Sequence, residues 1–158
     1  MKKSCKLCWG LSVLLVGAVA AMAYMFVIRG SIMASDDGRT AIILSAGERD
    51  LVLAEMRIFL ETIETITVAL GEKDMDAIAS SAHAVGMTAT QAVPVSLMGK
   101  LPLEFKSLGG ATHKAFDALA MEAREMGDEQ VVLRKLGKLM SNCTTCHAAY
   151  RFDIEDKK

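Results

Sequence analysis

The chain contains few of the residues that interrupt or replace helices. It has only two prolines among 158 residues, and aromatic residues make up 5% of the sequence. Alanine, leucine, methionine and glutamate, which favour helices, are instead frequent. The composition therefore predicts an all-α protein. With 52% hydrophobic residues, the chain is long enough for one domain with a sizeable core and an accessory segment.

The sequence also lacks a strong excess of either charge. Its formal net charge is −1, and the part after residue 28 holds 15 basic and 19 acidic side chains. A mildly acidic domain of this kind is not expected to bind nucleic acid. No Ser/His/Asp triad or pair of catalytic carboxylates can be recognised from residue spacing, so we do not expect an enzyme.

Charged residues are absent from Leu7 to Ile28, while three lysines precede this run and Arg29 follows it. A bilayer span needs about 20 apolar residues, so residues 1–28 are predicted to form an N-terminal membrane anchor. The lysines at its start predict that the rest of the chain lies outside. The small residues of Ala21-Met22-Ala23 also suit a cleavage site, which leaves a cleaved signal peptide and a soluble periplasmic protein as the alternative.

A cysteine motif lies close to the other end of the chain, where Cys143–His147 reads Cys-Thr-Thr-Cys-His. Two cysteines three apart, followed by histidine, are typical of the covalent attachment of a c-type haem. On a helix the two cysteines share a face and can reach the vinyl groups of a porphyrin, and His147 can turn a ring nitrogen toward the iron. A disulfide or half of a zinc site is the alternative, although zinc would need a second pair of Cys or His outside the anchor.

The residues between anchor and motif suggest a linker and a helical domain. Residues 29–47 are rich in glycine, serine and aspartate and are predicted to be a linker, and residues 48–158 the domain. Apolar residues recur at steps of three and four in segments of about 48–70, 75–90, 104–126 and from 129 through the motif to Tyr150. These segments predict four helices that bury their apolar stripes against one another.

Local signals indicate where these helices begin and end. Asp74 and Asp128 are expected to cap the second and fourth helices. Gly71 is a natural stop for the first helix. Gly109 and Gly110 cost about 1 kcal/mol each relative to alanine inside a helix, so we expect a break or a close approach there. The connection over residues 91–104 contains both prolines and is expected to be the longest in the domain, with a short turn in it.

The motif and its surroundings resemble the class II c-type cytochromes, the cytochrome c′ group. That family usually ends in CxxCHxxYR, and Tyr150 and Arg151 complete this pattern after the cysteine motif. The resemblance implies an antiparallel four-helix bundle with one covalently bound haem c, often assembled as a homodimer. It implies thioether bonds from Cys143 and Cys146, His147 as proximal iron ligand, and Arg151 near a haem propionate.

The sixth coordination position of such a haem decides between two functions. In low-spin relatives a methionine early in the first helix ligates iron, and Met56 occupies the corresponding region. Met/His ligation suits an electron carrier. A methionine on a helix stripe is usually a core residue, however. If Met56 only packs, then Val52 or Phe59 would cover the distal face and the five-coordinate haem would bind NO or CO.

Two further kinds of side chain could serve the same haem. His113 on the third helix is a less favoured candidate ligand, because a single histidine there is more often hydrogen-bonded within the structure. Arg49 and Arg57 could offset propionate charge, although a solvated helix face is the default for both. We therefore expect a monohaem c-type cytochrome, anchored in the bacterial inner membrane, that passes electrons between membrane and periplasmic redox proteins.

Overall fold

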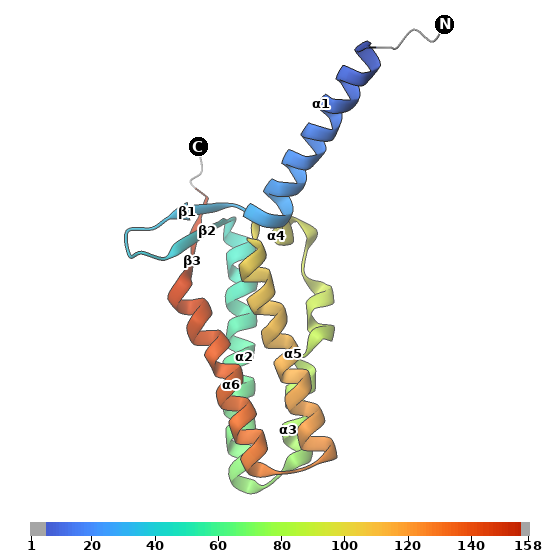
Figure 1. Cartoon of the computed structure of the whole chain (residues 1–158). Coiled ribbons are helices and arrows are strands. Elements are labelled where there is room, and N and C mark those ends of the chain that lie inside the picture. The colour runs from blue at the N-terminus through green and yellow to red at the C-terminus, as the bar shows by residue number, and fades with distance from the viewer. Residues whose placement is uncertain (1–5, 156–158) are drawn as a thin grey trace, which may run out of the picture.

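The computed structural model describes residues 6–155, so residues 1–5, at the start of the predicted anchor, and 156–158 lie outside it. The described chain is mostly helical, as the composition predicts (Figure 1). Its helices are α1 (Lys6–Ala23), the π-helix η1 (Tyr24–Arg29), α2 (Ala46–Glu72), α3 (Met75–Ala84), the 3₁₀-helix η2 (Met87–Ala92), α4 (Val95–Lys100), α5 (Leu103–Glu125) and α6 (Glu129–Ala149).

The first helix projects away from the rest of the protein (Figure 1). Its apolar part, Cys8–Arg29, is 22 residues long with a mean hydropathy of 2.4, and none of it is buried. A helix of this length and composition can cross a membrane, and a signal sequence has the same properties. The prediction of one N-terminal apolar helix is confirmed.

The four long helices α2, α3, α5 and α6 lie alongside one another (Figure 1). Packing is most extensive between α3 and α5, followed by α5 with α6 and α2 with α3, whereas α2 and α6 contact each other only sparsely. The predicted stripes supply most of the core between these helices, to which Ala69, Ala79 and Ala120 are added. This core, which we call the helix core, consists of Ile66, Ala69, Ile78, Ala79, Ala82, Val85, Phe116, Leu119, Ala120, Ala123, Val132, Leu136 and Leu139. The apolar periodicity therefore identifies the buried faces correctly.

The helix ends agree with the sequence in part. The carboxylates of Asp74 and Asp128 accept hydrogen bonds from backbone N–H groups in the first turns of α3 and α6, so both predicted caps are confirmed. Gly71 does not end its helix, because α2 continues to Glu72 and Lys73 adopts the left-handed conformation instead. The expected break at Gly109-Gly110 is also wrong. α5 runs through both glycines, and its packing between α3 and α6 outweighs their low helix propensity.

A small sheet shows that the protein is not all-α. Strand β1 (Ile32–Ala34) pairs antiparallel with β2 (Thr40–Leu44), and β2 pairs in parallel with β3 (Tyr150–Ile154). β1 and β2 lie in the segment predicted as a linker, so that segment is an ordered part of the domain. The sequence did not reveal this because the partner of β2 lies more than 100 residues away, where no local pattern reports the pairing.

The sheet forms one side of a second cluster of buried residues, which we call the sheet core. It consists of Ile42, Leu44, Val52, Leu97, Leu101 and Phe105. Ile42 and Leu44 are completely buried, so the apolar residues of β2 pack inside the domain and not on its surface.

A polar network joins the start of α2 to α4 and to the end of the chain. Ser45 caps α2 and forms a capping box with Glu48. Lys100 donates to the carboxylates of Glu48, at 2.7 Å, and Glu155, at 2.6 Å. The Lys100 ammonium, followed by the Ser45 backbone N–H, lowers the pKa of Glu48 to about 2.

We predict that Ile42→Ala lowers the free energy of unfolding by about 2–5 kcal/mol, because it leaves a cavity in the sheet core. Urea unfolding of the full chain in detergent, followed by circular dichroism, measures this change. Met33 in β1 is 62% exposed, so Met33→Ala should change the free energy by less than about 0.5 kcal/mol. Equal effects of the two substitutions would contradict the burial of β2.

Glu48→Gln should destabilise the protein at neutral pH, and the loss should depend on pH. A carboxylate with a lowered folded-state pKa stabilises the fold above its unfolded value of 4.5, and this contribution disappears as the pH falls toward about 2. The difference between parent and variant should therefore shrink over that range in urea unfolding experiments. Glu72→Gln, on an exposed residue, serves as control. A difference that is the same at pH 7 and pH 3 would contradict the charge interaction.

Candidate functional site

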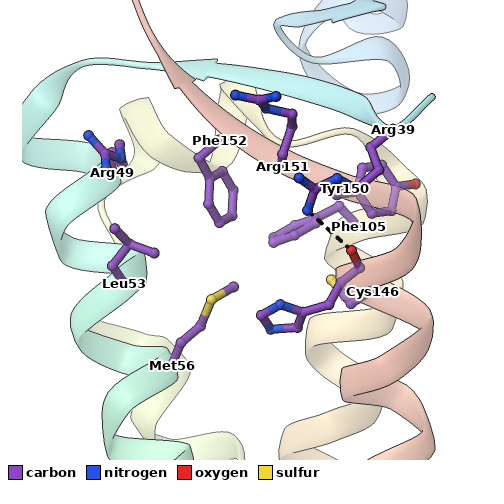
Figure 2. Close-up of a pocket in the computed structure, with 10 residues that line it drawn as sticks. Arg39, Arg49, Leu53, Met56, Phe105, Cys146, Tyr150, Arg151 and Phe152 are labelled. Atoms are coloured by element: carbon purple, nitrogen blue, oxygen red, sulfur yellow. Dashed lines mark hydrogen bonds between the residues drawn. The ribbon is translucent and has the colours of Figure 1, made fainter. Parts of the chain in front are cut away.

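A cavity of about 200 Å³ lies between α2, α6 and β3 (Figure 2). It is lined by Arg39, Arg49, Leu53, Met56, Phe105, Cys146, His147, Tyr150, Arg151 and Phe152. Ligand sites usually have volumes of about 300–1,000 Å³, so a large group bound here would extend beyond the cavity toward solvent. α2 and α6, which carry opposite walls of the cavity, contact each other only sparsely.

The cysteine motif occupies the last two turns of α6, which ends at Ala149. Both cysteines are half-buried: Cys143 packs against the helix core, and Cys146 packs against the sheet core and lines the cavity. His147 also lines the cavity and is exposed. The helical position of the motif agrees with the sequence prediction. The extension of this helix to Tyr150 does not, because Tyr150 begins strand β3.

Met56 lines the same cavity from the opposite side. It is half-buried on α2, and its side chain extends from α2 toward α6 (Figure 2). The other two α2 residues considered for this position do not line the cavity: Val52 is buried in the sheet core, and Phe59 stacks on Phe116 in the helix core at a centroid distance of 5.4 Å. The structure thus brings together Met56, Cys146, His147 and Arg151.

His113 lies outside the cavity, buried between α5 and its neighbours. Its Nδ1 is 2.8 Å from the carbonyl oxygen of Val85, and its Nε2 is 3.6 Å from the carboxylate of Glu55. Because a carbonyl oxygen only accepts, Nδ1 carries a proton and donates it to Val85. Both ring nitrogens therefore face protein groups, and the structure does not bring His113 to the predicted site.

Three arginines line the cavity and differ in their partners. Arg39 pairs with Asp37 at 2.6 Å, and Arg151 pairs with Asp153 at 2.8 Å and with Asp37 at 3.4 Å. Hydrogen bonds from Arg39 hold the pKa of Asp37 well below its usual range. Arg49, in the first turn of α2, makes no ion pair with a described residue. Its guanidinium is the one of the three without a carboxylate partner in the described chain.

Three lining residues were not predicted from the sequence: Arg39, Leu53 and Phe152. Arg39 lies in the segment predicted as a linker and reaches the cavity only because β2 pairs with β3. Leu53 lies between Val52 and Met56 and contributes to the wall, although it is outside the predicted apolar stripe. A helix face wider than the stripe would have included it.

Both motif cysteines are free thiols in the structure, and their surroundings favour the neutral form. Burial raises the pKa of Cys146 to about 11, with a smaller contribution from the neighbouring Cys143. Burial also raises the pKa of Cys143. One turn after Cys146, burial and a 3.2 Å hydrogen bond to the carboxylate of Glu104 raise the pKa of Tyr150. At neutral pH the site therefore offers neutral thiols, an imidazole, a thioether and three guanidinium groups.

Comparisons with known protein families, characterised proteins and solved structures find no match to this chain. Among residues 6–155, no group of three or more His, Cys, Asp or Glu side chains is arranged to hold a metal ion. The cavity and the cysteine motif are therefore the grounds on which a function can be assigned.

We predict that the two motif cysteines of the unmodified polypeptide react slowly with iodoacetamide at pH 7, because burial disfavours the thiolate that reacts. The pH midpoint of the alkylation rate should lie near 11 for Cys146, as the pKa of its thiol indicates. Peptide mass spectrometry resolves Cys143 and Cys146 from the N-terminal cysteines. In urea both midpoints should fall to about 8.5, the value of a free thiol. A midpoint of 8.5 in the folded protein would contradict the burial of these thiols.

Proposed function

We propose that this chain is a monohaem c-type cytochrome, similar to the class II c-type cytochromes, that transfers electrons between redox proteins of the bacterial inner membrane and the periplasm. The observation that carries the proposal is the position of Met56 and His147. The two side chains come from different helices, α2 and α6, and line one cavity beside the cysteine motif.

The residues around the cavity suit a haem. Cys143 and Cys146 are free, lie one helical turn apart and share a face of α6, as two thioether bonds to one edge of a porphyrin require. Leu53, Phe105 and Phe152 provide apolar and aromatic walls for a flat macrocycle. α2 and α6 contact each other only sparsely. This supports a four-helix bundle in which the haem lies between these two helices.

The two candidate axial ligands suit an electron carrier. When bound, haem iron supplies a reversible one-electron couple. Imidazole from His147 and thioether from Met56 would raise its reduction potential and leave no position open for an external ligand. Met56 and His147 are therefore assigned to the distal and proximal sides, and no catalytic residue is required.

The arginines would hold the propionate groups. Arg151 is the residue implied by the family resemblance, but its guanidinium already pairs with Asp153 and Asp37. Arg49 has no such partner among residues 6–155 and lines the cavity from α2. We therefore assign a propionate contact to Arg49 in addition to Arg151.

The apolar N-terminal helix supports a location of this function at a membrane. Cys8–Arg29 is long enough to span a bilayer, and the lysines before it favour an orientation with the domain in the periplasm. Its redox partners would then be membrane and periplasmic proteins, and a homodimer would follow the habit of the family. Cleavage of the helix would instead give a soluble periplasmic carrier.

One observation favours a second function, the binding of NO or CO by five-coordinate haem. Leu53 lies one turn before Met56 on α2 and lines the same cavity. An apolar side chain there could cover the distal face without ligating iron. The two functions differ in whether the thioether of Met56 binds the iron.

Substitution of Met56 distinguishes them. Met56→Ala should convert the absorption spectrum from low-spin to high-spin and let the ferrous protein bind CO at least about tenfold more tightly, because an axial ligand is removed. Met121 is 57% exposed on α5, so Met121→Ala should leave both properties unchanged. A spectrum unaffected by Met56→Ala, or a parent protein that binds CO readily without losing a ligand, would contradict Met/His ligation.

A further inference from the structure

The C-terminal end of the apolar N-terminal helix is hydrogen-bonded to the domain. Lys106 of α5 donates from Nζ to the backbone carbonyls of Val27 (2.9 Å), Met98 (3.3 Å) and Phe26 (3.4 Å). The N–H of Ser31 donates to the carbonyl of Lys100 at 2.7 Å. Because an ammonium group has three N–H donors, Lys106 is saturated by these contacts and joins η1 to α4 and α5.

Two glycines allow the backbones to approach closely at this junction. Gly30 has φ +66°, and a Cβ there would overlap the backbone of residues 100–102. A Cβ on Gly99 would lie 3.0 Å from the ring of Phe26. The helix that leaves the membrane is therefore seated on the domain and is not joined to it by a flexible tether.

Beside this junction lies an apolar groove that the domain leaves uncovered. Its volume is about 470 Å³, and it is lined by Phe26, Val27, Val95, Ser96, Met98, Gly99 and Lys106. The Val95 side chain is 88% exposed and that of Phe26 is 63% exposed. Contiguous apolar surface of this kind commonly marks contact with a membrane or a protein.

We propose that this groove receives an acyl chain of a phospholipid from the outer leaflet of the membrane that α1 spans. The groove is continuous with the candidate span, because Phe26 and Val27 belong both to Cys8–Arg29 and to the groove wall. Arg29 ends the span, and basic side chains at such positions reach the lipid headgroups. The inference rests on the membrane-anchor part of the proposed function and not on the haem.

A lipid chain in the groove would also fix the orientation of the domain relative to the bilayer. α4, the sheet and the base of α1 lie together at one end of the long helices (Figure 1). With a lipid chain held between η1 and α4, this end of the domain would face the bilayer. The cavity beside β3 is at the same end and would be kept close to the membrane surface.

Tryptophan fluorescence in vesicles tests this proposal. The full chain with Trp9→Phe and Val95→Trp is reconstituted into phosphatidylcholine vesicles with and without dibrominated acyl chains, which quench tryptophan on contact. Interfacial groups insert about 5–10 Å into the headgroup and acyl boundary, so we expect at least about twofold quenching and a blue-shifted emission. Met126→Trp in the same background is the control, because Met126 is 75% exposed between α5 and α6, at the opposite end of the long helices, and should not be quenched.

Trp9 of the parent protein reports separately on the anchor, since it lies within the span. If Trp9 is quenched but Val95→Trp is no more quenched than Met126→Trp, the groove does not hold lipid and the inference is overturned. A blue-shifted emission from Val95→Trp that the brominated chains do not quench would also overturn the inference. If Trp9 itself is not quenched, the membrane anchor fails and the inference fails with it. Circular dichroism of each variant confirms that it is folded.

Discussion

The parallel pairing of β2 with β3 is the constraint on which the candidate site depends. Its register runs from Thr40 opposite Tyr150 to Leu44 opposite Ile154, so the segment that follows the apolar N-terminal helix lies beside the segment that follows the cysteine motif. Three consecutive residues of β3, Tyr150 to Phe152, thereby form one wall of the cavity. Because α2 starts directly after β2, the same pairing sets the first turns of α2 opposite the last turns of α6.

The helix core and the sheet core hold these elements together. The helix core joins the C-terminal part of α2 to α3, α5 and α6, and the sheet core holds the end of the domain where α1 leaves. The motif stands at the boundary, since Cys143 packs against the helix core and Cys146 against the sheet core. A haem bound through both would contact the two cores together, between the sparsely packed helices α2 and α6. Cofactor binding and folding would then stabilise each other.

Local sequence signals predicted the elements that depend on local physics. The periodic apolar positions identified the long helices, and Asp74 and Asp128 were recognised as caps because a cap acts within its own turn. Met56 was selected by its place early in the first predicted helix, as the family resemblance implies, and it lines the cavity together with His147. The sheet, Arg39 and the continuity of α5 through Gly109 and Gly110 were not predicted. Each depends on contacts between residues far apart in the chain, which neither propensity nor periodicity reports.

Covalent haem content is the most direct measure of the central claim, that the cavity and the cysteine motif hold a c-type haem. The chain should be produced in bacteria able to attach c-type haem, and its intact mass and alkaline pyridine spectrum recorded after acid–acetone extraction. The account predicts a mass greater than that of the polypeptide by one haem, with the haem resistant to extraction and lost when Cys143 and Cys146 are both replaced by serine. A parent protein without haem, or haem retained equally by the double variant, would contradict it.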